Sequence, residues 1–212
     1  MRNIIVLVGK AATGKDEIET QLEKNFGVRR LVSHTSRPKR DGEVDGENYY
    51  FTTKQVINKM IKEGHTIEHT SYKVDGETWH YALSKKELKK IPKGKYGVVT
   101  VNPHGVNQLI NQKSIIDNLI IVYLKSSQID RMERYFKREK NNTPLVVKRR
   151  WEQRLEQDLK DFEWFESKAL KKINELKIPL LTYHNLQRDT KELNNLGQDV
   201  FKYILAWNKK KD

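Results

Sequence analysis

Short apolar runs alternate with amphipathic stretches along most of the chain. The first run, residues 3–8, ends at Gly9 and is followed by Ile18, Leu22 and Phe26 at helical spacing. Further runs, with helical spacing between them, lie at residues 97–101, 119–124 and 178–182. A short apolar run bounded by turn residues is typical of a buried strand, and apolar residues four apart are typical of a helix. This alternation predicts βα units that build a parallel sheet.

The pattern changes between the first predicted helix and residue 97. Residues 49–52, 66–72 and 78–83 have the composition of short strands. Asp75 and Gly76, which separate the last two, are typical of a hairpin turn. We therefore predict a β-rich insertion in a protein that is otherwise built on a parallel sheet.

A long helical segment is predicted from residue 127 to residue 174. Asn141 and Asn142 interrupt it. Thr143 and Pro144 predict its restart, because threonine is a good N-cap and proline fits the first helical position. Most arginines of this segment are expected on a solvated face. The lysine run at residues 209–211 is expected to be a frayed end without a role.

The composition narrows the class of protein. A length of 212 residues predicts one domain, and the 36% of hydrophobic residues are enough for a core even though 33% of the residues are charged. No window has the roughly 18 to 20 apolar residues of a membrane span, so we expect a cytoplasmic protein without a membrane segment. The absence of cysteine excludes disulfides, thiolate zinc sites and cysteine nucleophiles. The net charge of +13 favours a polyanionic partner, either nucleic acid or a nucleotide.

The residues after the first predicted strand have the spacing of a phosphate-binding loop. They are Gly9, Lys10, Ala11, Ala12, Thr13, Gly14, Lys15 and Asp16. Glycines let the backbone curl so that its N–H groups face phosphate oxygens, and Lys15 reaches the β- and γ-phosphates. Asp16 replaces the usual serine or threonine that ligates Mg²⁺, and a carboxylate is also an oxygen ligand for Mg²⁺. The loop therefore predicts ATP binding, with a tight turn that binds no nucleotide as the alternative.

The next segment carries a longer pattern. It contains Ser33, Thr35, Arg37, Arg40, the Gly-Glu-Val-Asp-Gly run at residues 42–46, and Tyr49. Taken alone, it is compatible with a charged, solvated loop. Together with the phosphate loop it resembles the guanylate kinase family. The resemblance implies a P-loop NTPase-type parallel sheet flanked by helices, with a small β-rich insertion that binds the nucleoside monophosphate (NMP) and a helical lid. It divides the single domain 1–212 into a core (1–32, 96–126 and 176–212), an NMP-binding lobe (33–90) and a lid (about 134–152).

The resemblance also implies an acceptor site. Its residues would be Ser33, Arg37, Arg40, Tyr49, Glu68 and Tyr81. Of these, Ser33 and Glu68 would contact the base and the others the phosphate. An arginine fork can bind two phosphate oxygens. Glu68 can accept hydrogen bonds from N1 and N2 of guanine, a donor pair that the other common bases lack.

Several departures from the family pattern affect this site. Leu83 stands where the family has a threonine or serine, so Ser84 is a candidate to replace that hydroxyl. The hairpin that precedes Leu83 is longer than in the family. Thr100 and Asn102 stand where the family has two aspartates. We infer that the contacts to Mg²⁺ and to the acceptor are redistributed, with Asp16 as a metal ligand and with Thr100 and Asn102 beside the acceptor.

The later part of the chain resembles the family more thinly. Arg131 and Arg134 fall in a segment that resembles its adenine-binding side, and Arg138 and Arg150 fall in segments that resemble its lid. We expect the first two to bind ATP. The last two are expected to act in catalysis, with Lys15 and the two acceptor arginines.

The predicted function is transfer of the γ-phosphoryl group of ATP to GMP or dGMP with Mg²⁺, by a monomer or a homodimer. Such in-line transfer depends on positioning and on charge neutralisation. The alternatives are a kinase for different or more (deoxy)nucleoside monophosphates, a catalytically silent guanylate-kinase-like module that binds protein partners, and a nucleic-acid-binding protein. No helix-turn-helix, zinc finger or aromatic RNA motif supports the last alternative, so we do not expect nucleic acid as a partner.

Overall fold

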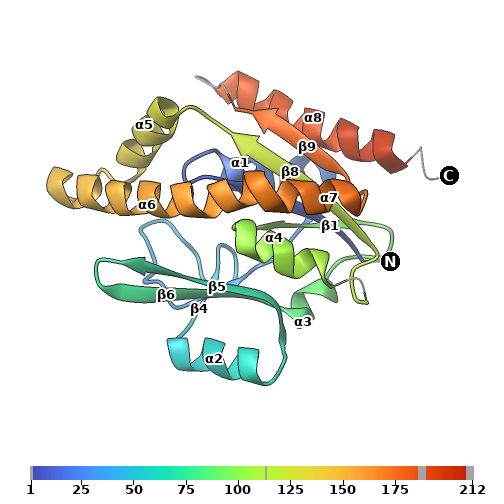
Figure 1. Cartoon of the computed structure of the whole chain (residues 1–212), viewed down its shortest axis with the longest axis horizontal. Coiled ribbons are helices and arrows are strands. Elements are labelled where there is room, and N and C mark those ends of the chain that lie inside the picture. The colour runs from blue at the N-terminus through green and yellow to red at the C-terminus, as the bar shows by residue number, and fades with distance from the viewer. Residues whose placement is uncertain (1, 113, 186–189, 209–212) are drawn as a thin grey trace.

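A five-stranded parallel sheet forms the centre of the fold (Figure 1). The computed structural model describes residues 2–112, 114–185 and 190–208. The strands in their spatial order are β2 (Arg29–Arg30), β7 (Tyr96–Thr100), β1 (Asn3–Gly9), β8 (Asn118–Lys125) and β9 (Leu180–His184), and every neighbouring pair is parallel. The predicted parallel sheet is confirmed.

The central strand β1 explains why the apolar runs are continuous. All seven of its residues are buried, and Val6 lies opposite Val99 on one side and Ile121 on the other. A parallel strand with both faces covered needs apolar side chains at every position rather than at alternate ones.

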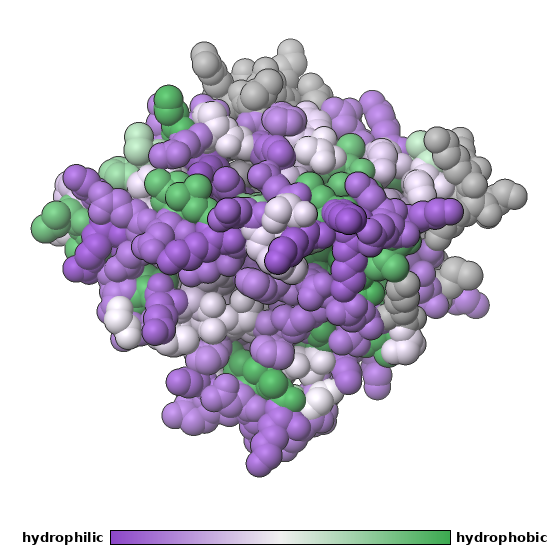
Figure 2. Space-filling model, in the orientation of Figure 1, coloured by the Kyte–Doolittle hydropathy of each residue, from purple (hydrophilic) through white to green (hydrophobic). Residues whose placement is uncertain are grey.

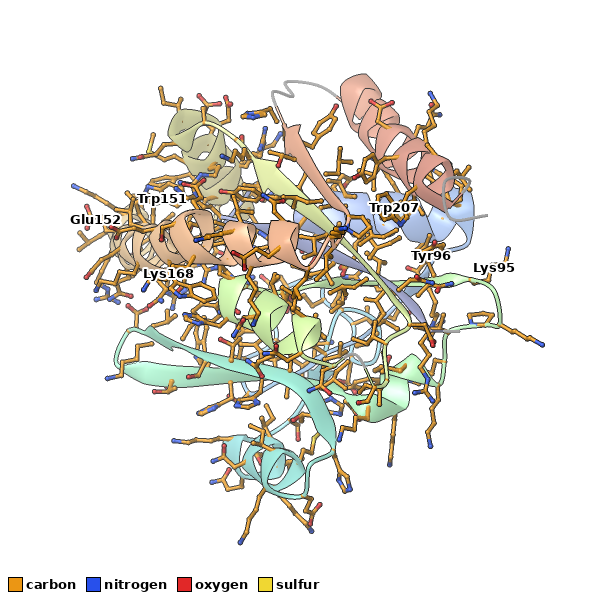
Figure 3. The ribbon with its side chains drawn as sticks, turned by 45° about the vertical axis from the view of Figure 1, so that its right-hand side comes forward. Lys95, Tyr96, Trp151, Glu152, Lys168 and Trp207 are labelled. Carbon is orange, nitrogen blue, oxygen red and sulfur yellow. The ribbon has the colours of Figure 1, made fainter. Side chains whose placement is uncertain are left out.

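Helices cover both faces of this sheet. Ile5 and Leu7 of β1 pack with α1 (Lys15–Phe26) and α8 (Thr190–Asn208), and the labelled Tyr96 and Trp207 border the same core cluster (Figure 3). On the opposite face, Val6 packs in a second cluster with further helical segments. These are α4 (Pro103–Ile110), α6 (Pro144–Trp164), the π-helical turn Phe165–Ala169 and α7 (Leu170–Glu175).

A second, four-stranded sheet corresponds to the predicted β-rich insertion. Its order is β4 (Tyr50–Phe51), β3 (His34–Thr35), β6 (Glu77–Ser84) and β5 (Thr66–Val74). Helices α2 (Lys54–Lys62) and α3 (Lys85–Leu88) flank it, and α2 lies on the side away from α6 (Figure 1). Asp75 and Gly76 have φ angles of 50° and 83°, the positive pair that a tight hairpin turn requires. The predicted turn is confirmed.

Helix α5 (Gln128–Arg138) and α6 are separate, and α6 begins at Pro144 as predicted. Thr143 is the N-cap residue, but its side chain makes no capping hydrogen bond. Trp151 of α6 packs on Tyr135 of α5 with ring centroids 5.3 Å apart. In Figure 3, the labelled Trp151 and Glu152 show where this contact lies along α6, with Trp151 buried and Glu152 exposed.

One predicted strand is displaced. The apolar run 178–182 predicted a strand, and β9 begins two residues later, at Leu180. The N–H of Ile178 bonds to the Ile173 carbonyl at the end of α7, and Pro179 has no N–H to give to a neighbouring strand. Ile178 and Pro179 therefore belong to the connection between α7 and β9 and not to the strand.

The surface is predominantly polar. On the face seen in Figure 2, hydrophilic side chains dominate and hydrophobic ones form small separate patches. Among the described residues, no helix is long and apolar enough to cross a bilayer. The lysine run 209–211 lies outside the described residues.

Candidate active site

A cleft of about 1000 Å³ lies between the end of β1, the second sheet and helices α5 and α6. Most of the residues predicted for the site line it. They are Gly9, Ala11, Ala12, Thr13, Gly14, Lys15, Asp16, Ser33, Arg37, Arg40, Tyr49, Glu68, Tyr81, Thr100, Asn102, Arg134, Arg138 and Arg150. The volume is at the upper end of the range for small-molecule sites and is ample for two nucleotides.

The phosphate loop joins β1 to α1 and curls through two residues with positive φ, Ala12 at 59° and Gly14 at 92°. The Lys15 ammonium donates to the carbonyls of Gly9 (2.7 Å) and Lys10 (2.9 Å). Burial lowers the pKa of Lys15 to about 8. Helix α1 begins at Lys15, so its positive end also faces the cleft. The loop is thus built to bind an anion.

A glycine is required at the first loop position by close packing. A Cβ on Gly9 would lie 2.6 Å from the Leu124 carbonyl oxygen and 2.8 Å from the Thr13 hydroxyl. Neighbouring strand β8 therefore approaches the start of the loop too closely for any side chain.

Three predicted site residues do not line the cleft. The Lys10 ammonium lies 5.8 Å from the centroid of the Phe162 ring. Ser84 is buried and its hydroxyl caps α3 by accepting from the Lys86 N–H, so it does not take the place of the hydroxyl lost at Leu83. Arg131 is buried in an ion pair with Asp158 at 2.9 Å. These three side chains contact other protein groups and lie outside the cleft lining, and their contacts to ligands stay predictions.

Arg131 nevertheless acts on the phosphate loop from outside the cleft. Its guanidinium donates to the Ala11 carbonyl at 3.2 Å and to Asp158, while the same Asp158 oxygen accepts from the Ala11 N–H at 2.8 Å. Asn185 donates to the Thr13 carbonyl at 2.8 Å. Side chains from α5, α6 and the end of β9 therefore hold the loop in its curl.

The loop between β3 and β4, called the acceptor loop from here on, carries the two arginines predicted to bind the acceptor phosphate. Arg37 is buried, donates to Glu43 at 2.6 Å and lies 5.4 Å from the centre of the Tyr49 ring. The backbone N–H of Arg40 donates to the second Glu43 oxygen at 2.8 Å, and its side chain extends to 3.6 Å from Glu139. Burial raises the pKa of Tyr49, so its phenol remains a hydrogen-bond donor. Glu43 thus holds the Arg37 side chain and the backbone of Arg40 before an acceptor binds.

Glu68 lies deeper in the cleft and is only 3% exposed. Burial raises its pKa to about 8, against the effect of a hydrogen bond from the Leu83 backbone. Among the described residues it has no ion-pair partner. Nearby, Asn102 caps α4 by accepting from the Gly105 N–H at 2.8 Å, and it donates to the Thr70 hydroxyl at 2.9 Å. Glu68 is therefore a buried carboxylate in the cleft with a hydrogen bond from the Leu83 backbone and no compensating cation among the described residues.

Asp16 faces the cleft beside Lys15 and also borders a small side cavity of about 20 Å³, together with Glu19 and Thr100. Burial raises the pKa of Glu19 to about 7; its ion pair with Arg30 opposes this rise and the charge of Asp16 adds to it. Mg²⁺ prefers oxygen ligands and takes one or two carboxylates while keeping several waters. Among the described residues no cluster of three or more acidic or histidine side chains surrounds Asp16, so it fits this requirement as a single carboxylate that would share the ion with phosphate oxygens and water.

The lid arginines occupy different surroundings. Arg138 lines the cleft and lies 5.1 Å from the centre of the Tyr135 ring. Arg150 also lines it, but its Nε is 2.7 Å from Asp75 at the hairpin turn, which Arg149 also contacts at 2.9 Å. The hairpin and α6 are therefore linked across the cleft (Figure 1).

Several cleft residues were not predicted from the sequence, chiefly Tyr72, Arg154 and Asp161. Arg154 and Asp158 are four positions apart on α6, and their side chains lie 3.3 Å apart. This spacing is typical of an ion pair on a helix, so the pair could have been predicted from the sequence. Nothing local connects Asp158 to Ala11, because 147 positions separate them.

Comparisons with known proteins agree with this geometry. The family described as guanylate kinase matches residues 1–170. A guanylate kinase of Wigglesworthia glossinidia brevipalpis is 34% identical over 143 residues, which cover 66% of this chain and 65% of that protein. The chloroplastic/mitochondrial guanylate kinase 2 of Oryza sativa subsp. japonica is 40% identical over 91 residues, or 42% and 28% of the two chains. This chain therefore spans less than two thirds of the length of these two relatives.

The fold is also shared with a solved structure. The crystal structure of guanylate kinase from Anaplasma phagocytophilum has a TM-score of 0.59 to this chain, with 16% identity, and the match covers 96% of this chain and 85% of that one. At this identity the likeness concerns the fold.

Proposed function

Because this chain belongs to the guanylate kinase family, we propose that it transfers the γ-phosphoryl group of ATP to GMP or dGMP. One observation carries the proposal: a single cleft is lined by Lys15 of the phosphate loop and by Arg37 and Arg40 of the acceptor loop. In the reaction, an oxygen of the acceptor phosphate forms a bond to the γ-phosphorus while the bond from that phosphorus to the β–γ bridging oxygen breaks. ADP and a nucleoside diphosphate result.

In this proposal, different residues of the cleft bind the phosphates of ATP and the phosphate of the acceptor. Lys15 and the loop N–H groups would neutralise the β- and γ-phosphates, and Arg37 and Arg40 would hold the acceptor phosphate in line. Arg138 would add charge from the lid side, and Arg134 would contribute on the ATP side. Mg²⁺, with Asp16 as a ligand, would neutralise the charge that develops on the phosphate oxygens.

We propose the same division of the chain that the sequence suggests. The large sheet with residues 1–32, 96–126 and 176–212 would be the core, residues 33–90 the NMP-binding lobe, and residues 134–152 the lid. Closure of a lid over the cleft would exclude water and suppress hydrolysis of ATP.

A coupled assay that follows ADP release with ATP, Mg²⁺ and each of the eight common (d)NMPs tests the function. We expect turnover with GMP and dGMP. Turnover with none of the eight would overturn the kinase proposal and favour a binding module. Equal turnover with several bases would favour a kinase that accepts more than one (deoxy)nucleoside monophosphate. Leu83 and Asn102, which depart from the family pattern, support that alternative.

The acceptor assignment predicts that Arg40→Ala raises the KM for GMP by about 10- to 100-fold, because a charge-assisted contact to one substrate is lost. The KM for ATP should change by less than about twofold. Steady-state kinetics with each substrate varied in turn measure both. Lys54→Ala, on an exposed site of the same lobe, is the control and should resemble wild type. An equal rise in both KM values would contradict the assignment.

The metal assignment predicts that Asp16→Ser raises the Mg²⁺ concentration for half-maximal rate several-fold, because the substitution removes the carboxylate that we propose as a metal ligand. The nucleotide KM values at saturating Mg²⁺ should change less. If Asp16 only stabilises the first turn of α1, the cost should be below about 1 kcal/mol of stability and the titration should overlay that of wild type. Identical titration curves would show that Asp16 is not a ligand of Mg²⁺.

A further inference from the structure

Arg154 is a cleft residue whose position differs from that of the other α6 arginines. It is one turn beyond Arg150, lines the cleft, and its side chain is 27% exposed. Its guanidinium carbon lies 4.4 Å from the centre of the Tyr72 ring in the second sheet. The guanidinium therefore lies over an aromatic ring of the second sheet, at a distance typical of a cation–π contact.

The carboxylate of Asp158 fixes Arg154 relative to the phosphate loop. One Asp158 oxygen lies 3.3 Å from Arg154 Nε, and the other accepts from the Ala11 N–H at 2.8 Å and from Arg131 at 2.9 Å. Asp158 is 1% exposed. Arg154 is thus linked through one buried carboxylate to the donor side of the cleft and through Tyr72 to the acceptor side.

The charges in the cleft support a role near the reacting phosphates. Burial is the main cause of the low pKa of Lys15, and the positive charges of Arg154 and Arg138 lower it further. Both arginines therefore act electrostatically on Lys15. Arg150, in contrast, is held by Asp75 at the hairpin turn. Both Arg150 and Arg154 thus have a carboxylate partner, but that of Arg154 is the buried Asp158, which also contacts the phosphate loop, whereas that of Arg150 lies at the hairpin turn.

We propose that Arg154 is a catalytic residue whose guanidinium neutralises the phosphoryl group during its transfer, and that Asp158 is its positioning residue. This inference rests on the proposed phosphoryl transfer. The guanidinium would donate hydrogen bonds to the non-bridging oxygens of the phosphoryl group while the bond to the β–γ bridging oxygen breaks and the bond to the acceptor oxygen forms. Arg154 itself exchanges no atoms.

Arg154→Met tests this role, because it removes the charge and leaves a side chain that can still contact Tyr72. Asp158 keeps its contacts to Arg131 and Ala11, so the phosphate loop should remain held. We expect kcat to fall by a factor on the order of 10², with both KM values within about threefold of wild type. Arg154→Lys should recover part of the loss. Lys148→Met, which removes a charge from the exposed face of the same helix, should leave kcat unchanged.

Binding measurements separate this inference from the proposed function. The probe is the bisubstrate P1-(5′-adenosyl)-P5-(5′-guanosyl) pentaphosphate, compared by calorimetry with ATP alone and GMP alone. In Arg154→Met we expect weaker binding of the bisubstrate with ATP and GMP affinities near wild type. Equal weakening for all three, or an unchanged kcat, would overturn the catalytic role. A wild-type protein without phosphoryl transfer would overturn the proposed function. Bisubstrate binding that is the same in Arg154→Met as in wild type would overturn the role of Arg154.

Discussion

Lys15→Met is expected to lower kcat for phosphorylation of GMP by a factor on the order of 10³. The ammonium group lies inside the curl of the phosphate loop, 2.7 Å from the Gly9 carbonyl. Methionine keeps most of the length of the side chain and none of its charge. Although burial lowers the pKa of Lys15 to about 8, bound phosphates favour the charged form, so the wild-type group acts as a cation in the complex.

The comparison for this prediction is Lys24→Met, at an exposed site in the last turn of the same helix. It should retain wild-type kcat. Thermal unfolding of both variants checks that the loop and helix still fold. A folded Lys15→Met protein with kcat within about twofold of wild type would refute the role of the phosphate loop in catalysis.

Glu68→Gln is expected to lower kcat/KM for GMP by a factor on the order of 10³ while the KM for ATP stays near its wild-type value. The buried carboxylate can accept from both guanine donors, whereas an amide replaces one acceptor oxygen with an NH₂ group that faces a donor. Glu77→Gln, on the exposed part of the same hairpin, is the control. Kinetics with GMP and ATP varied separately measure the effect. Equal losses for both substrates would refute base recognition by Glu68.

The raised pKa of Glu68 adds a pH dependence. At a pKa of about 8 the free protein holds this proton at neutral pH, whereas the unfolded chain loses it near its ordinary value of 4.5. The free energy of unfolding therefore falls as pH rises from about 4.5 to 8, and Glu68→Gln should lack this part of the fall. Urea unfolding of both proteins at pH 5 and pH 8.5 measures the difference. The same logic predicts proton release on GMP binding below pH 8, seen as a KM for GMP that decreases toward pH 8.

Parts of the site that depend on contiguous residues could be predicted. The strand, loop and helix from Asn3 to Phe26 form one continuous unit, so apolar spacing and glycine positions suffice to identify it. The turn at Asp75 and Gly76 is likewise local. The displacement of β9 had a local cause in Pro179, but apolar composition alone placed the strand two residues too early.

Side-chain partners across the fold could not be predicted in this way. The sequence predicted Arg131 at ATP and Ser84 near the base, but it did not indicate that Arg131 is buried against Asp158 or that Ser84 caps α3. The sequence locates each residue on its helix or strand, but the direction of its side chain depends on the elements that pack against it.

The sequence by itself determined the parallel α/β core, the β-rich insertion and the phosphate loop, because periodicity, turn residues and loop spacing are properties of neighbouring positions. Only the tertiary structure decided which charges face the cleft. Asp75 compensates Arg150 across 75 positions, and Asp158 links Arg154 to the phosphate loop across 147. The energy of a charge in a cleft depends on burial and on the nearest opposite charge, and both are set by the packing of elements that are distant in sequence.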